Sequence, residues 1–290
     1  METSENNVNN LPQDEYVEQA YLFKLLRQRI GEQMPIQELL DQSQHELLTT
    51  TKLPMAINYL ATEVKHSGLL APAMYGLPHY FTSFQSYLVD ESEQETGRFT
   101  MDGALQVLEA EANFRLQSST CQALFFFQFE VLCRNRLSYD RGLTAISRDP
   151  SFNTEWSKWI LHLRAQVGLV EFADLLFLAS EHYRNRLVAS GNSLDGKGPF
   201  LFGEKEGRIA FANRKKEPLF LFSAMQRHLG YPEVPRPKPE DPNRNLLPTL
   251  QRKVDQLEQR IQLMEQEQRT AGMDITKFYA KHKPPNFPED

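Results

Sequence analysis

Apolar residues recur at three- and four-residue spacings over most of the chain, which is the spacing of helices that bury one face. The most regular series begins after Pro150 and contains six residues: Phe152, Trp156, Trp159, Ile160, Leu163 and Val167. Prolines and glycines divide the pattern into about eight to ten helical segments. The sequence therefore predicts a mainly α fold, with one helical domain over residues 13–230 that forms an irregular multi-helix bundle or a short α-solenoid.

The most apolar segment, residues 120–137, is expected to be the central helix of this domain. It contains four phenylalanines, and Gln128 and Glu130 interrupt it. A helix that is apolar on nearly all sides belongs inside a bundle rather than on its surface. Ser119 is followed three residues later by Gln122, which matches a capping box and indicates that the helix starts after Ser119.

The pattern changes after Gly196, where two short apolar segments, residues 199–203 and 208–213, flank Glu204-Lys-Glu-Gly207. Apolar segments on either side of a glycine-containing turn are typical of a β-hairpin. Because two strands are not stable alone, we expect this hairpin, over about residues 199–213, to pack on the helical domain or on a partner.

The two ends of the chain differ from the helical domain. Five prolines follow Gly230 (Pro232, Pro235, Pro237, Pro239 and Pro242), so residues 231–246 read as an extended linker. Residues 1–12 are polar and rich in asparagine, and residues 272–290 are rich in proline and charge. Both compositions are typical of disorder, so we expect a disordered N-terminus and a flexible C-terminal tail. The tail mixes basic and aromatic residues, which suits either a docking peptide or an inert end.

Residues 247–271 carry the most specific pattern in the chain. Six apolar residues alternate at three and four positions: Leu247, Leu250, Val254, Leu257, Ile261 and Met264. Val254 and Ile261 then occupy a positions, and Leu250 and Leu257 occupy d positions, a combination that favours a parallel two-stranded coiled coil. In that register Lys253 faces Glu258 of a second copy, and Arg260 faces Glu265. Two alternatives remain, in which this helix folds back on its own domain or docks on another protein.

Charge and cysteine usage narrow the class of protein. The chain has 32 basic and 38 acidic side chains, a net charge of −6, which is the wrong sign for a general binder of nucleic acid or anionic membranes. No apolar run is long enough to span a bilayer, and the first residues lack the features of a signal peptide. Cys121 and Cys133 lie about 18 Å apart along one predicted helix, too far for a disulfide. We therefore expect a cytoplasmic protein.

Two Arg-Asn-Arg-Leu segments, residues 134–137 and 184–187, follow apolar stretches and suggest a helical hairpin used twice. Glu130 precedes the first segment and Glu181 the second at intrahelical ion-pair spacings, which favours salt bridges at the rim of the core. The alternative is a shared anion site, because planar guanidinium groups suit oxyanions. That site would consist of four residues: Arg134, Arg136, Arg184 and Arg186.

Other candidate chemistry is weak. Glu63 and His66 lie one turn apart on a predicted helix, as metal ligands of four-helix bundles do, although a cap near the Gly68 helix stop suits His66 better. Residues 191–198 resemble a phosphate-binding loop, but Gly198 replaces the required Ser or Thr and the flanking elements are in the wrong order. No other catalytic or cofactor motif is present.

Taken together, the sequence favours a non-catalytic cytoplasmic interaction or scaffold protein without a cofactor. It would self-associate as a parallel coiled-coil dimer and present its helical domain to a protein partner of unknown identity, with no nucleic-acid or membrane partner. The main alternative is an enzyme or small-ligand binder with a pocket in the helical domain, using an anion site at Arg134 and Arg184 or a metal at Glu63 and His66. A third reading is a regulator that binds nucleic acid through a local basic surface.

Overall fold

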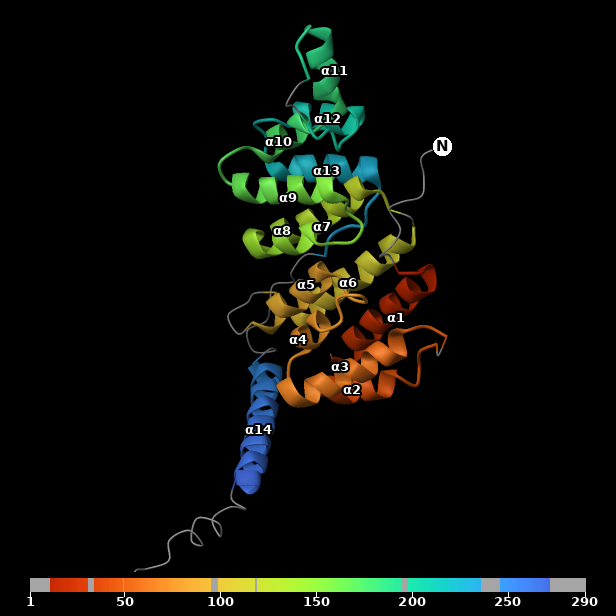
Figure 1. The fold of residues 1–290 in the computed structure, drawn as a ribbon, viewed down its shortest axis with the longest axis vertical. Helices are drawn as coiled ribbons and strands as arrows, with labels where there is room; N and C mark the ends of the chain where they lie inside the picture. The colour runs from red at the N-terminus through yellow and green to blue at the C-terminus, as the bar shows by residue number, and fades with distance from the viewer. Residues whose placement is uncertain are drawn as a thin grey trace, which may run out of the picture. The chain divides into compact units, whose positions relative to one another are not determined.

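A computed structural model describes residues 11–30, 34–48, 50–94, 99–117, 119–194, 198–235 and 246–271. Within these ranges the protein is helical, which confirms the predicted mainly α class (Figure 1). The helices are α1 (Gln13–Ile30), α2 (Ile36–Ser43), α3 (Leu53–Ser67), α4 (Leu70–Tyr75), α5 (Ser83–Glu93), α6 (Met101–Leu116), α7 (Cys121–Asn135), α8 (Tyr139–Ser147), α9 (Thr154–Gln166), α10 (Phe172–Leu178), α11 (Glu181–Ala189), α12 (Glu204–Ala212), α13 (Pro218–Leu229) and α14 (Leu246–Ala271).

The chain divides into two compact units, one over residues 1–64 and 69–239 and the other over residues 65–68 and 240–290. Residues 1–10 of the expected disordered N-terminus, the tail and most of the expected linker lie outside the described residues, whereas Leu11 is described and packs against the core. Part of that linker is described, and there Tyr231 and Val234 are buried, so the core of the first unit extends past residue 230.

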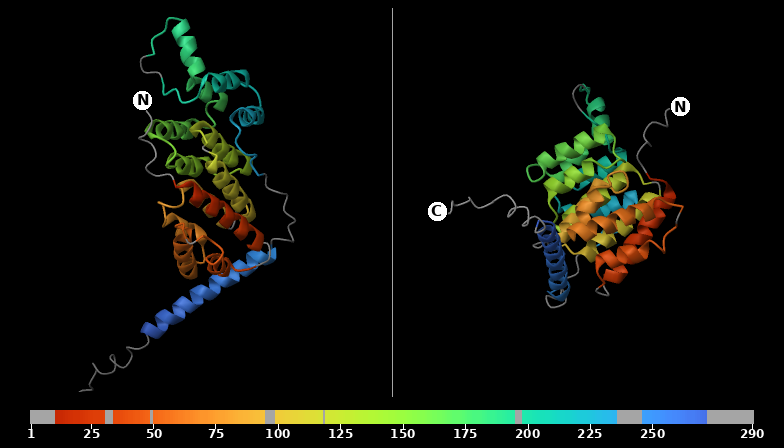
Figure 2. Two further views of the ribbon diagram at one scale, coloured as in Figure 1. Left: turned by 90° about the vertical axis from the view of Figure 1, so that its right-hand side faces the viewer. Right: turned by 60° about the horizontal axis from the view of Figure 1, so that its bottom comes forward.

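The helices of the first unit lie in successive layers (Figures 1 and 2). α6 packs along α1, α5 packs on both α6 and α8, and α8 packs on α7 and α9. α13 lies against α7, α10 and α12, and α11 packs on α10 and α12. Several of these pairs, α1 with α6 and α7 with α13, join helices that are distant in sequence, so the layers do not follow chain order.

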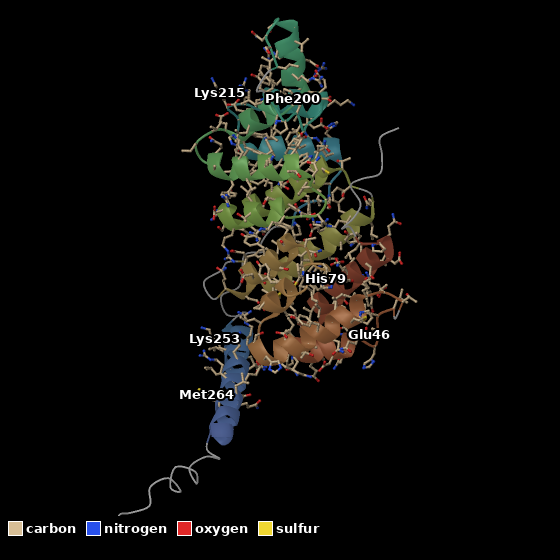
Figure 3. All side chains as sticks on the ribbon, viewed as in Figure 1. Glu46, His79, Phe200, Lys215, Lys253 and Met264 are labelled. Atoms are coloured by element: carbon tan, nitrogen blue, oxygen red, sulfur yellow. The ribbon has the colours of Figure 1, made fainter. Side chains whose placement is uncertain are left out.

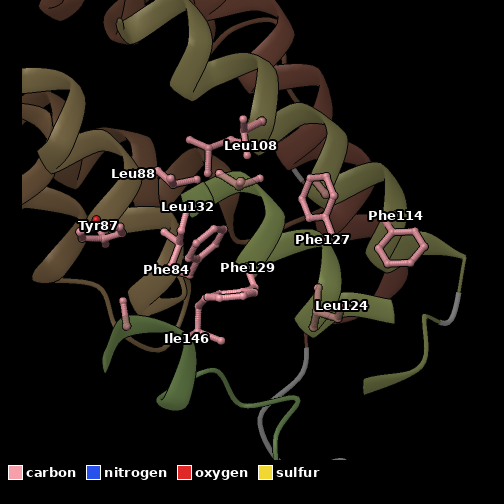
Figure 4. Packing of buried hydrophobic residues seen from close by; sticks show 14 of the residues in the cluster. Phe84, Tyr87, Leu88, Leu108, Phe114, Leu124, Phe127, Phe129, Leu132 and Ile146 are labelled. Carbon is pink, nitrogen blue, oxygen red and sulfur yellow. The ribbon is translucent and has the colours of Figure 1, made fainter. Parts of the chain in front are cut away.

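α7 is the buried helix that its composition predicts. Phe125, Phe126 and Phe127 are fully buried, and the rings of Phe125 and Phe126 both lie near that of Phe202. Figure 4 shows the other side of α7, where Phe127 and Leu132 pack among buried residues of the preceding helices. The N-cap is Thr120 rather than Ser119, because the Thr120 hydroxyl accepts the Ala123 N–H at 3.3 Å.

The predicted β-hairpin at residues 199–213 is wrong. Residues 204–212 form helix α12, and Phe202 instead makes an isolated bridge with Ser180. Gly207 is a point of close approach between helices rather than a turn residue, because a Cβ there would lie 2.3 Å from the Ser180 Oγ. Glu204 and Glu206 suit the first turn of a helix, where negative charge is stabilised by the helix dipole.

Ser180 also separates α10 from α11 in the apolar stretch that precedes the second Arg-Asn-Arg-Leu segment. Its hydroxyl caps α11 by accepting the Tyr183 N–H at 3.3 Å, and the next N–H, that of Glu181, bonds to the Phe202 carbonyl at 2.8 Å. The second Arg-Asn-Arg-Leu segment therefore lies inside α11 and not at the end of an apolar helix, unlike the first. The sequence echo has no structural counterpart.

Candidate functional site

α14 is one continuous helix of 26 residues in the second unit. Five of the six apolar residues that the heptad pattern singles out are between 48% and 57% exposed: Leu250, Val254, Leu257, Ile261 and Met264. The sixth, Leu247, is in the helix, but its side chain lies outside the described ones. Figure 3 labels Lys253 and Met264 on this helix. An apolar stripe that stays exposed along a polar helix is typical of a surface that another helix covers.

The half-buried residues of α14 show which face of this helix contacts other residues, and this tests the alternative in which the helix folds back on its own domain. These are Arg252, Gln256 and Gln259, and the last two lie beside Gly68 of the same unit, within 3.1 Å of a Cβ built there. At 100° per residue, this polar face is centred about 150° around the helix from the apolar stripe. The face of α14 nearest to other residues of its unit is therefore not the apolar one.

The structure places the four arginines of the predicted anion site on helices with different neighbours. Arg134, on α7, forms the predicted salt bridge with Glu130, whose other carboxylate oxygen accepts the Tyr231 hydroxyl at 2.6 Å. Arg136 is exposed at the left-handed C-cap of α7. α7 packs on α8 and α13.

The other two arginines lie on α11, which packs on α10 and α12. Arg184 is exposed, and the described residues include no ion pair between it and Glu181. The guanidinium of Arg186 lies over the Phe211 ring at 4.8 Å. No described contact joins these two arginines to Arg134 or Arg136, so their role as one anion site stays a prediction.

Glu63 and His66 both lie on α3, where Glu63 is half-buried and His66 is exposed in the last turn. Across the described part of the chain, no group of three or more His, Cys, Asp or Glu residues is placed to hold a metal ion. Both cysteines are free, and burial raises the pKa of the Cys133 thiol to about 12.

A buried polar cluster, absent from the sequence-based predictions, joins α6, α7 and the segment before α9. The Arg115 side chain, 3% exposed, bonds to Glu111 at 2.8 Å and forms a bidentate ion pair with Asp149. Gln128 donates to the same two carboxylates, at 2.8 and 3.1 Å. The i, i+4 spacing of Glu111 and Arg115 was a signal, but Asp149 lies 34 residues further on.

The two carboxyls of this cluster have pKa values shifted in opposite directions. Burial raises the pKa of Glu111, and the charge of Asp149 adds to that effect while Arg115 opposes it. Burial also acts to raise the pKa of Asp149. The charge and hydrogen bonds of Arg115, together with hydrogen bonds from Ser151 and Gln128, outweigh burial and hold the pKa of Asp149 below its usual value. Because Glu111, Arg115, Gln128 and Asp149 are all buried, the cluster fits a structural role.

A more open site is a groove of about 330 Å³ between α4, α5, α8 and α9. Three arginines line it: Arg141, Arg148 and Arg164. These arginines are absent from the sequence-based predictions, although Arg141 and Arg148 are seven residues apart and so share one face of a helix. Nothing in the local sequence indicates that Arg164, on the next helix, lies beside them.

Comparisons of the chain with protein-family models, with curated proteins and with solved structures found no match. Among the described helices, none combines the length and the apolar composition needed to cross a membrane. The candidate surfaces therefore rest on their own chemistry, and the exposed stripe of α14 is the one with the most specific pattern.

Proposed function

We propose that this chain is a non-catalytic, cytoplasmic interaction or scaffold protein that self-associates through α14 as a parallel coiled-coil dimer. The observation that supports the proposal is the half-exposed stripe of Leu250, Val254, Leu257, Ile261 and Met264 along an unbroken helix. A second copy of the stripe is the occupant that the pattern favours, because β-branched residues at a and leucines at d pack best against themselves in two strands.

Charge complementarity supports the same occupant. In the parallel register Lys253 would face Glu258 of the second helix, and Arg260 would face Glu265, so both flanking contacts are attractive. The polar face near Gly68 is left free of the interface in this arrangement. Because three heptads make a short coiled coil, we expect a dimer that dissociates on dilution.

The first test is the mass in solution, measured by light scattering over a range of concentrations, for the full chain and for a chain that ends at Glu240. A dimeric full chain with a monomeric truncation supports the proposal. Two monomers would favour a helix that folds back or awaits another protein. Two dimers would place the interface in the first unit and contradict a role for α14.

A matched pair of substitutions tests the stripe itself. Ile261→Asp puts a charge at an a position and is expected to abolish the dimer, whereas Gln262→Asp adds the same charge one residue away, outside the stripe, and is expected to leave the dimer intact. If both variants dimerise like the wild type, the stripe is not the interface. The orientation follows from Leu250→Cys and Met264→Cys. A parallel pair crosslinks each residue to its own copy, and an antiparallel pair crosslinks residue 250 to residue 264.

A further inference from the structure

We propose that the groove between α4–α5 and α8–α9 binds a phosphate monoester between Arg148 and Arg164. This site is independent of α14, since all of its residues belong to the first unit. It also uses none of the arginines that the sequence pattern singled out.

α8 supplies one side of the site. Arg141, Thr144 and Arg148 follow one another at three- and four-residue spacings, so they share one face of the helix. Arg148 is the C-cap of α8, where the negative end of the helix dipole stabilises a cation. Its side chain is exposed and forms no ion pair or hydrogen bond within the described part of the chain.

α9 supplies the other side. Arg164 lies in the last turn of α9, and its Nη1 donates to the Thr144 Oγ1 at 2.8 Å, which fixes its guanidinium beside α8. Its carboxylate neighbour Asp140 is 3.6 Å from its Nε and is 80% exposed, so this ion pair is weak and easily displaced. Among the described residues, Arg148 and Arg164 therefore have no buried counter-ion, and both can take a new anion.

Arg141 sets the limit of the site. Its guanidinium is paired with Asp90 and with Glu91 at 3.0 Å, and it lies over the Tyr87 ring at 5.6 Å. Those carboxylates satisfy Arg141 and repel anions at its end of the groove. An anion would therefore lie at the Arg148 end, between two planar groups whose forked N–H donors match phosphate oxygens.

The size of the groove and the charge of the chain indicate the class of ligand. A volume of about 330 Å³ suits a small molecule or a single side chain. A net charge of −6 opposes the approach of a long polyanion such as nucleic acid. A phosphate monoester carries up to two negative charges, which two arginines can match, and it reaches such a groove either on a small metabolite or on a phosphorylated protein side chain.

The test is a titration of the full chain followed by ³¹P NMR at constant ionic strength. Glycerol 3-phosphate represents the small molecules, and a blocked Gly-phosphoserine-Gly peptide represents the phosphorylated proteins. We expect saturable binding of at least one of them with a Kd of roughly a millimolar or tighter, and the tighter of the two identifies the source. No saturable shift with either probe would overturn the proposal.

Four variants locate the site. Arg148→Met and Arg164→Met are each expected to weaken binding about tenfold or more, and Arg208→Met, an exposed arginine on α12, should not change it. Asp140→Asn removes the competing carboxylate and should tighten binding at least about twofold, a gain that loss of folding cannot produce. Equal affinity in all four variants would show that phosphate binds elsewhere, and the proposal would be wrong.

Discussion

The buried Arg115 offers the sharpest test of the energetics of this fold. Its guanidinium makes four hydrogen bonds, at 2.8 Å to Glu111, 3.0 Å to Ser151 and through two contacts to Asp149. Arg115→Met keeps much of the aliphatic volume but removes every one of these bonds. Two fully buried carboxylates would then face each other without a cation.

We expect this substitution to lower the free energy of unfolding by about 3–5 kcal/mol, the usual cost of removing one partner of a buried ion pair. That is a large part of the roughly 5–15 kcal/mol that stabilises a typical domain. The matched control is Arg208→Met, because Arg208 is 69% exposed and pairs with Glu204 one turn away at 3.0 Å. An exposed pair of this kind contributes little to stability, because solvent screens it.

The assay is urea unfolding followed by circular dichroism at neutral pH. A triple variant, with Glu111→Gln and Asp149→Asn added to Arg115→Met, separates charge from packing. If the unpaired charges cause the loss, the triple variant recovers most of it, since no uncompensated charge is then buried. A triple variant as unstable as the single one would show that lost packing is the cause. An Arg115→Met variant within about 1 kcal/mol of the wild type would refute the reasoning altogether.

Three further predictions concern packing and pH. Gly142→Ala should lower the free energy of unfolding by about 1–3 kcal/mol, because its Cβ would lie 2.6 Å from the buried Leu132 side chain. The control Gly103→Ala, whose Cβ would lie 3.4 Å from its nearest neighbour, should be neutral or stabilising. Urea unfolding midpoints measure both effects. The pKa of Asp149 lies below its usual value, so its stabilising effect is present above about pH 3.9 and is lost as the pH falls through the folded-state pKa. The Asp149→Asn variant should therefore be less stable than the wild type at neutral pH, and the difference in free energy of unfolding should shrink in acid. The pKa of Glu111 is raised, so its contribution to stability is present below about pH 4.3 and is lost as the pH rises through the folded-state pKa. The stability of Glu111→Gln relative to the wild type should therefore increase from pH 4 to pH 8 in the same urea assay.

Local spacing was sufficient where one helix decides the structure. The apolar run over residues 120–137 gave the buried helix α7, and the i, i+4 spacing of Glu130 and Arg134 gave their ion pair. The heptads from Leu250 onward correspond to a continuous helix with an exposed apolar stripe. In each case the periodicity that decides burial or pairing lies within a few turns of one element.

The spacing of residues in the sequence did not predict the structure where contacts between distant elements determine it. The alternation of small and apolar residues after Gly207 fits a strand as well as a helix, and the packing of Gly207 against Ser180 favours the helix. The Tyr231 hydroxyl donates to the Glu130 carboxylate, although the two residues are 101 positions apart in the sequence. Likewise, no local pattern shows that Arg164 donates to Thr144 across two helices. Contacts of this range depend on the assembled fold, so sequence periodicity alone cannot supply them.

The partners of each arginine separate structural from functional candidates more reliably than the arginine-rich motifs do. Arg115 and Arg134 each meet a buried carboxylate, so their charges stabilise the fold and are not available to a ligand. Arg148 has no such partner in the part of the chain that the structure describes, and Arg164 has only an exposed one. A guanidinium that lines a groove without a buried counter-ion keeps its donors for an external anion. Because that groove and the α14 stripe belong to different units, we expect the Ile261→Asp chain to lose self-association and still bind phosphate. Loss of both properties together would mean that the two sites are coupled.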